Sequence, residues 1–195
     1  MSRVHVKQEQ VINARPETVY AALTDYAGQR TQILPPNFLD YAVEKGGHGD
    51  GTIVRYRLRA ARRERPYRMV VHEAARGKVI TESDSNSSLV TTWTILPEEH
   101  GQQTKVRVTS EWKGSSGIGG FFERAFAPLG LKSIYSRMLN ALNTTVQAAE
   151  GRDVEESTEN TVVKKLLLRL ALFVGVLVFS AGLALLQKRF NQTRV

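Results

Sequence analysis

The sequence predicts an α+β fold: an antiparallel sheet of about seven strands, a long C-terminal helix, and one transmembrane helix beyond it. Three observations lead to this prediction. Apolar and polar residues alternate in short runs between Phe38 and Trp112, which is the period of strands. Apolar residues then recur at helical spacing from Leu131 to Val146. Residues 170–186 are 17 consecutive residues without a charge, as in a membrane-spanning helix.

The first elements are a strand and a short helical region. In residues 3–12, RVHVKQEQVI, valines alternate with polar residues, as in a half-buried strand. Pro16 favours a helix start, and apolar residues follow it at helical spacing: Val19, Leu23 and Tyr26. Pro35 and Pro36 end this helical region.

Six further strands are predicted between residues 38 and 112. Segments rich in turn-forming residues separate them, at 45–51, 60–66, 75–77, 84–88 and 98–103. Because such short turns can join only antiparallel neighbours, the sheet is expected to be antiparallel. The segment GSSGIGG, residues 114–120, is expected to end it.

The last part of the globular region is predicted to be a long helix. Its apolar stripe has spacings of four, three, four and four residues: Leu131, Tyr135, Met138, Leu142 and Val146. Pro128 and Gly130 are expected to kink it or separate it from the preceding segment. We therefore expect one globular domain over residues 1–149.

An acidic linker and a membrane anchor are predicted after this domain. Residues 150–163 hold five acidic residues and no aromatic one, which is typical of a flexible linker. Residues 164–190 form the predicted anchor with its basic flanks. At 1.5 Å per residue its 17 uncharged residues span about 26 Å, close to the hydrocarbon thickness of a bilayer. A buried core helix is the alternative, but such helices keep a polar face.

The anchor sets an expectation for localisation. The first ten residues lack the apolar run of a secretory signal peptide. Basic residues near the two ends of the span are equal in number, so the positive-inside rule does not orient it. We expect a single-pass, tail-anchored protein whose N-terminal domain is cytoplasmic.

A cluster of arginines supplies the positive charge of the domain. The chain has a formal net charge of +8. Residues 55–68 contain one glutamate and seven arginines: Arg55, Arg57, Arg59, Arg62, Arg63, Arg65 and Arg68. Strand parity places Arg55, Arg57, Arg59 and Arg68 on the outer face, and we expect the other three in the connecting turn. The alternatives are a solvated face with cross-strand ion pairs, or a contact with anionic headgroups.

Nucleic acid is not the expected partner of this cluster, because Tyr56 and Tyr67 share a strand face with apolar residues and are expected to point inward. The chain has no cysteine, no helical histidine pair and no G-x-S-x-G motif. We therefore expect no metal, no cofactor and no nucleophile of these classes. Glu82 and Asp84 are a close carboxylate pair, which we expect to be a solvated strand end rather than catalytic.

Several segments carry a resemblance to a known family. They are NARPETVYAALTDY (13–26), GGHGDGTIVRYRL (46–58), SSLVTTWTI (87–95) and the stretch from Thr109 to Leu139. In this order the chain resembles the START/Bet v 1-like (SRPBCC) superfamily, and more closely the bacterial polyketide cyclase/dehydrase-type proteins within it. The resemblance implies a helix-grip fold, in which a curved sheet surrounds the long helix and an apolar cavity lies between them. It implies binding of lipids, sterols, polyketides or other hydrophobic ligands, and catalysis in a minority of members.

Strand parity and helical spacing indicate which side chains face such a cavity. They are Tyr56, Leu58, Tyr67, Met69, Val71, Thr91, Trp93, Val106, Val108, Ser110, Trp112, Phe122, Phe126, Tyr135, Met138 and Leu142. A solid core would use the same residues. The leading hypothesis is a membrane-tethered binding module for a hydrophobic small molecule or lipid. The alternatives are a polyketide cyclase/dehydratase-like enzyme and a binder of anionic surfaces or nucleic acid through residues 55–68.

Overall fold

The computed structural model describes residues 3–60, 63–114 and 128–151. Along the chain the named elements are β1 (Arg3–Ile12), α1 (Pro16–Thr24), α2 (Gln29–Ile33), β2 (Phe38–Lys45), β3 (Ile53–Ala60), β4 (Arg63–Ala75), β5 (Val79–Asp84), β6 (Val90–Glu98), η1 (Glu99–Gly101) and β7 (Gln103–Lys113). A helix over residues 128–151 follows, here called the long helix.

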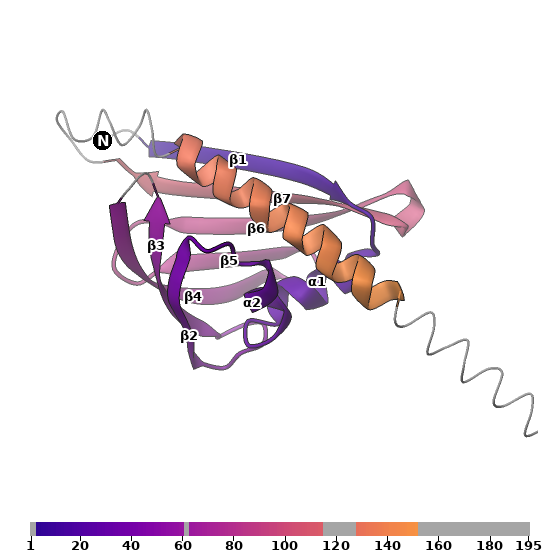
Figure 1. Ribbon diagram of the computed structural model, residues 1–195, viewed down its shortest axis with the longest axis horizontal. Coiled ribbons are helices and arrows are strands. Elements are labelled where there is room, and N and C mark those ends of the chain that lie inside the picture. The colour runs from indigo at the N-terminus through magenta and orange to yellow at the C-terminus, as the bar shows by residue number, and fades with distance from the viewer. Residues whose placement is uncertain (1–2, 61–62, 115–127, 152–195) are drawn as a thin grey trace, which may run out of the picture. The chain divides into compact units, whose positions relative to one another are not determined.

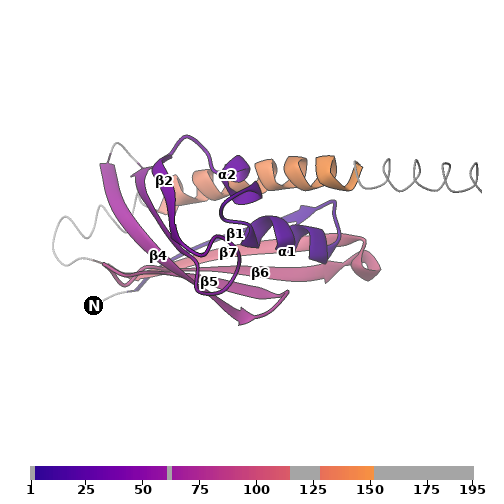
Figure 2. The ribbon, with the colours of Figure 1, turned by 90° about the horizontal axis from the view of Figure 1, so that it is seen from below.

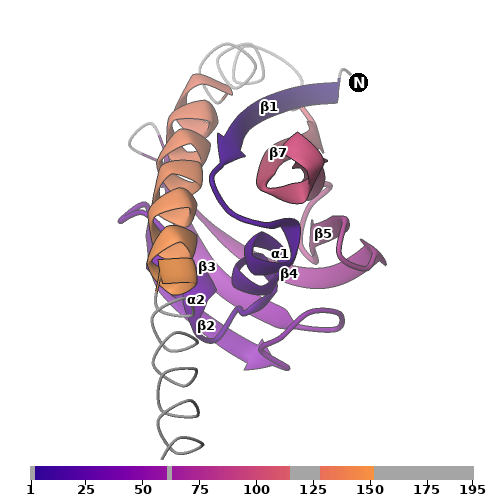
Figure 3. The same ribbon diagram turned by 90° about the vertical axis from the view of Figure 1, so that its right-hand side faces the viewer.

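The strands form one antiparallel sheet in the order β1-β7-β6-β5-β4-β3-β2. Consecutive strands from β2 to β7 are neighbours, and β1 joins the free side of β7 with Val6 opposite Ser110. The sheet is curved, and the long helix lies across its inner face together with α1 and α2 (Figures 1, 2 and 3). The predicted antiparallel sheet and long helix are thereby confirmed.

Polar contacts hold the far end of the long helix against the start of α1. The Glu150 carboxylate accepts hydrogen bonds from the backbone N–H of Arg15 at 3.0 Å and the hydroxyl of Thr18 at 2.9 Å. The Asn143 side chain accepts another from the backbone N–H of Asn13 at 2.9 Å. These bonds pair two backbone N–H groups just before α1, and they tie that segment to the long helix.

The core fills the space between the sheet and the helices. Inward residues of the strands alternate with exposed ones, as in β7, where Thr104, Val106, Val108 and Ser110 are buried. The long helix adds buried residues at helical spacing: Ile134, Tyr135, Met138, Leu139, Leu142 and Val146. The predicted stripe is confirmed, with Leu131 half-buried at its beginning.

The loop between β2 and β3 is a hairpin turn, as its glycines predicted. Gly46 has a φ of 72°, and an added Cβ there would lie 2.9 Å from the Thr52 hydroxyl. That hydroxyl accepts a hydrogen bond from the backbone N–H of Gly47 at 3.1 Å. Glycine is therefore needed both for the left-handed backbone and for this close contact.

The turn predicted at residues 60–66 is wrong, because β4 already begins at Arg63. Ala60 pairs with Arg63 and Leu58 with Arg65, so strand pairing continues almost to the tip of the hairpin. Arg63 and Arg65 are therefore strand residues and not turn residues. Arg62 lies outside the described residues.

The predicted linker and anchor also lie outside the described residues, apart from Glu150 and Gly151 in the long helix. The chain divides into two units, Met1–Glu150 and Gly151–Val195. Within the described ranges, no helix is both long and apolar enough to cross a bilayer. The membrane anchor remains a prediction from the sequence.

Candidate functional site

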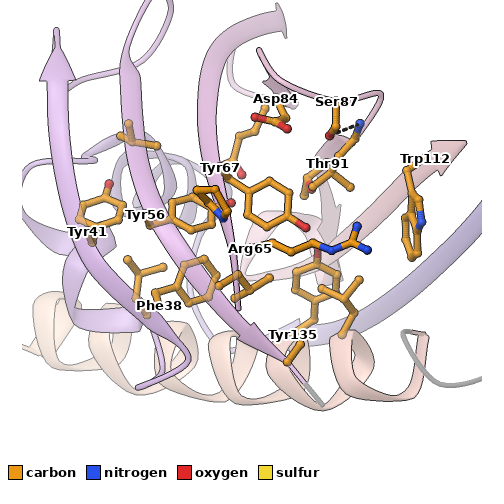
Figure 4. A pocket seen from close by; sticks show the side chains of 18 of the residues that line it. Phe38, Tyr41, Tyr56, Arg65, Tyr67, Asp84, Ser87, Thr91, Trp112 and Tyr135 are labelled. Carbon is orange, nitrogen blue, oxygen red and sulfur yellow. Dashed lines mark hydrogen bonds between the residues drawn. The ribbon is translucent and has the colours of Figure 1, made fainter. Parts of the chain in front are cut away.

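A cavity of about 590 Å³ lies within the first unit, and its wall includes residues of the sheet, α2 and the long helix. Figure 4 shows side chains from several strands and from the long helix projecting into it. Much of its wall is apolar: Leu34, Phe38, Val54, Leu58, Leu131 and Met138. This volume lies in the usual range for small-molecule sites, so the cavity can hold a ligand of moderate size.

The structure places half of the predicted cavity residues in this wall. Those that line it are Tyr56, Leu58, Tyr67, Thr91, Trp93, Trp112, Tyr135 and Met138. The others that the structure describes are buried in the surrounding core: Met69, Val71, Val106, Val108, Ser110 and Leu142. Phe122 and Phe126 lie outside the described residues. Strand parity identified the inward face correctly but could not separate cavity wall from solid core.

Aromatic rings cover one side of the cavity. Tyr56 lies at their centre, with its ring centroid 4.9 Å from that of Phe38, 5.7 Å from Tyr67 and 6.4 Å from Tyr41. Burial raises the pKa of Tyr56 and of Tyr41 far above the ordinary tyrosine value. These phenols are therefore neutral at physiological pH, and the wall offers flat, polarisable faces to a ligand.

A buried ion pair, which was not predicted, lies in the same wall. The Arg30 guanidinium donates to the Glu82 carboxylate with an Nη2–Oε1 distance of 2.6 Å. The Tyr26 hydroxyl donates to the same oxygen at 2.7 Å. All three residues line the cavity, and all three are buried. The expectation that Glu82 and Asp84 form a solvated strand end is wrong, since each is only 7% exposed.

The environment of Arg30 keeps its charge. Burial opposes the charged form, but the Glu82 carboxylate and the neighbouring tyrosines together outweigh burial and raise the pKa of Arg30 above its ordinary value. The guanidinium also lies over the Trp93 ring, with Cζ 4.4 Å from the centroid, and 5.3 Å from that of Tyr26. Such cation–π contacts stabilise a guanidinium away from water.

One sequence signal could have revealed Glu82 and Asp84. Ile80, Glu82 and Asp84 alternate along β5 and share its buried face. The Asp84 carboxylate accepts a hydrogen bond from the backbone N–H of Arg68 at 3.0 Å, so it is held inward. Arg30 carried no such signal, because α2 has only five residues and its position over the sheet depends on the fold.

Three hydroxyl groups form a second polar feature. The Ser110 hydroxyl is 2.7 Å from that of Thr91 and 2.5 Å from that of Tyr135. The Tyr135 ring meets Trp93 edge-on, with centroids 6.2 Å apart. Burial raises the pKa of Tyr135, while the hydrogen bond with Ser110 partly opposes this. A continuous set of hydrogen-bonding groups therefore links β6, β7 and the long helix in and beside the cavity wall.

Another part of the wall is exposed and positively charged. Its exposed residues are Arg63, Arg65, Pro66, Asn86, Ser87, Ser88 and Lys113. Figure 4 shows Arg65 projecting into the cavity from β4. We call this the cavity mouth. Arg63 and Arg65 therefore do not belong to a separate patch on the outer face.

The outward arginines form cross-strand ion pairs. Arg55 and Arg68 both contact Glu44, at 3.6 and 2.7 Å. Arg57 contacts Asp40 at 2.6 Å and Glu64 at 2.7 Å, and Arg59 also contacts Glu64 at 2.7 Å. The predicted outer-face row is therefore present, and acidic side chains of β2 and β4 accompany it. This arrangement agrees with the interpretation of the row as a solvated, ion-paired face.

Comparisons with known proteins agree with this architecture. The model of the family described as polyketide cyclase/dehydrase and lipid transport matches residues 3–147. The solution structure of the KanY protein is 37% identical in sequence, and the match covers 75% of this chain and 99% of that one, with a TM-score of 0.66. No curated protein matches the sequence.

More distant structures share the fold. The crystal structure of the Zhui aromatase/cyclase from a Streptomyces species is 15% identical and covers 75% of this chain and 94% of its own, with a TM-score of 0.60. Norcoclaurine synthase from Thalictrum flavum is 12% identical and covers 76% of this chain and 97% of its own, with a TM-score of 0.60. At these identities the two structures indicate a common fold alone.

Proposed function

Because the chain belongs to the polyketide cyclase/dehydrase and lipid transport family, within the START/Bet v 1-like superfamily, we propose that its cavity binds a hydrophobic small molecule or lipid. The observation that carries this proposal is the cavity itself, about 590 Å³ of space with largely apolar and aromatic walls. Buried polar groups, among them Arg30 and Tyr135, interrupt the apolar wall and can orient what enters.

We further propose that the domain is tethered to a membrane. The support for this part is the uncharged segment 170–186 with its basic flanks. A membrane concentrates apolar molecules, and a short linker would keep the cavity within reach of them. Fractionation of cells that express the full chain tests the tether, because an anchored protein resists extraction by high salt and alkali. Release of the chain by either treatment would contradict it.

Native mass spectrometry tests ligand binding. The unit of residues 1–150, purified from cells without detergent, should carry a bound small molecule or take one up from a panel of lipids and apolar ring compounds. Met138→Trp places a large side chain in the cavity wall and should abolish this binding. Leu129→Trp is the matched control, because Leu129 lies on the same helix, is 65% exposed and does not line the cavity.

Two outcomes would count against the binding proposal. An empty protein that also ignores the whole panel would contradict it directly. Binding that survives Met138→Trp would place the ligand outside this cavity.

An enzyme of the cyclase/dehydratase kind is the second candidate. The observation that favours it is the pairing of the buried Glu82 with Arg30, and the nearby hydroxyls of Thr91, Ser110 and Tyr135. A buried carboxylate and a phenol are groups that can exchange protons with a bound substrate. The discriminating experiment supplies a poly-β-ketone thioester: Glu82→Gln and Tyr135→Phe should then lower turnover more than binding. Binding without turnover would leave the binding module as the function.

A further inference from the structure

Two hydrogen-bond donors in the cavity wall are buried without an acceptor. They are Nη1 of Arg30 and Nε1 of Trp93, and no group of the described residues accepts a hydrogen bond from either. Both residues line the cavity, and they are in contact, with the Arg30 guanidinium 4.4 Å from the Trp93 ring centroid. The side chains that carry the two donors therefore meet in one small region of the cavity wall.

The neighbouring acceptor is already in use. Oε1 of Glu82 accepts hydrogen bonds from Nη2 of Arg30 at 2.6 Å and from the Tyr26 hydroxyl at 2.7 Å. The ion pair thus uses Nη2 of Arg30 and provides no acceptor for Nη1. Leaving a buried donor unpaired costs free energy, and the cost is larger for a charged group. Most buried donors in proteins are paired, so two adjacent exceptions in a cavity wall point to an external acceptor.

Charge decides which acceptor suits these donors. The positive charge of Arg30 is balanced by Glu82, and the buried Asp84 carboxylate lines the same cavity. A ligand carboxylate placed here would add a second uncompensated negative charge in a buried site, which is costly. A neutral oxygen, such as that of a ketone, ester or amide, accepts the same hydrogen bonds without this cost. Cationic Arg63 and Lys113 belong to the cavity mouth, where an anionic group would be favoured instead.

Resting on the proposed function, we propose that the cavity binds apolar molecules that carry a neutral oxygen acceptor, and binds them oxygen first. The oxygen accepts hydrogen bonds from Arg30 and Trp93, while the apolar body lies along the wall that Phe38, Tyr56 and Met138 provide. The Arg30–Glu82 pair thereby positions a donor for the ligand and excludes anionic groups from the same place.

Three naphthalene probes of nearly equal size test this: 2-acetylnaphthalene, 2-ethylnaphthalene and 2-naphthoate. Isothermal titration calorimetry compares their affinities for the full-length wild type and for Trp93→Phe, prepared identically. The variant removes the indole N–H but keeps an aromatic ring. The ratio of two probe affinities is compared between the two proteins, because this comparison cancels the different partition of the probes into lipid or detergent and any change in packing that affects both probes equally.

We expect the wild type to bind the ketone at least about tenfold more tightly than the ethyl compound, since a hydrogen bond from a charged donor contributes on this scale. Trp93→Phe should reduce that ratio by about three- to tenfold, as for the loss of one neutral hydrogen bond. The carboxylate should bind more weakly than the ketone, and its affinity should not respond to Trp93→Phe.

Equal affinities for the ketone and the ethyl compound would overturn this inference while leaving an apolar binding cavity in place. A ratio that Trp93→Phe does not change would also overturn it. A carboxylate that binds most tightly and loses this advantage in Trp93→Phe would show that the acceptor is anionic. If the wild type binds none of the probes, this inference fails, whereas the proposed function fails only if the protein also binds nothing from the panel of lipids and apolar ring compounds.

Discussion

The side chains of Arg30 and Glu82, 52 residues apart in the sequence, form a 2.6 Å ion pair inside the cavity wall. Both are buried, with Arg30 on the short helix α2 and Glu82 at the centre of the sheet. A buried ion pair is costly to break from one side only, because the remaining charge has no compensation.

Arg30→Met should therefore destabilise the protein by about 3–5 kcal/mol, which urea denaturation can measure. The double variant with Glu82→Met removes both charges and should recover a large part of this loss, since two apolar side chains can replace a buried pair. A loss below about 1 kcal/mol in Arg30→Met would contradict the buried pair.

The hydroxyl chain of Ser110 and Tyr135 connects β7 to the long helix. Ser110→Ala and Tyr135→Phe should each lower the free energy of unfolding by about 1–2 kcal/mol, because each leaves a buried hydroxyl with one partner fewer. The double variant should cost less than the sum of the two, since both changes remove the same hydrogen bond. Thr109→Ala, on the other face of β7, is the control. Strict additivity would show that the two hydroxyls act independently.

Stability should fall at alkaline pH. Burial raises the pKa of Tyr26, Tyr56 and Tyr135 in the folded protein, so folding favours their neutral forms. Their contribution to stability is fully present below the unfolded tyrosine pKa of about 10 and is lost as the pH rises above it. Unfolding free energies between pH 8 and 11 measure the slope, and Tyr56→Phe should make it shallower. Ionisation of all six tyrosines near pH 10 in the folded protein, seen by absorbance, would disprove this.

The cavity mouth is the part of the arginine cluster that we expect to contact anionic headgroups. A ligand can pass between a bilayer and the cavity only if the mouth faces the bilayer, and basic residues near the surface favour that orientation. Arg63→Glu with Arg65→Glu, in a chain ending at Glu150, should weaken sedimentation with vesicles that contain phosphatidylserine. Arg55→Glu with Arg57→Glu is the control of equal charge, on the outer face. An equal effect of both pairs would indicate attraction by net charge alone.

Much of the fold could be predicted because its signals are local. The period of two in β3 or β7 and the helical spacing from Leu131 to Val146 follow from which faces are buried. The glycines between residues 46 and 51 predicted the turn after β2, and in the structure they have positive φ. The prediction of a turn at residues 60–66 was wrong because it also used local composition alone. Charged residues such as Arg63 are typical of turns, but the pairing of β3 with β4 extends through them.

The candidate site could be predicted only in part. Parity placed Tyr56, Thr91 and Trp93 on the inner face, and the structure places all three in the cavity wall. Parity could not indicate where the core leaves space, because that depends on how closely the helix approaches each strand. Parity also could not predict the ion pair of Glu82 with Arg30, since the residues around each of them contain no signal of a contact 52 positions away.

The sequence by itself predicted the strands and the long helix, because periodicity and turn chemistry are properties of neighbouring residues. The family followed from the resemblance of several segments, and the family model matches residues 3–147. Only the tertiary structure decided the meaning of the charged residues. Glu82 and Asp84 were expected to be a solvated pair, but the fold buries both. The described arginines lie partly on an ion-paired outer face and partly at the cavity mouth. The physical reason is that burial and pairing of a charge depend on distant residues, which only the folded chain brings within hydrogen-bond distance.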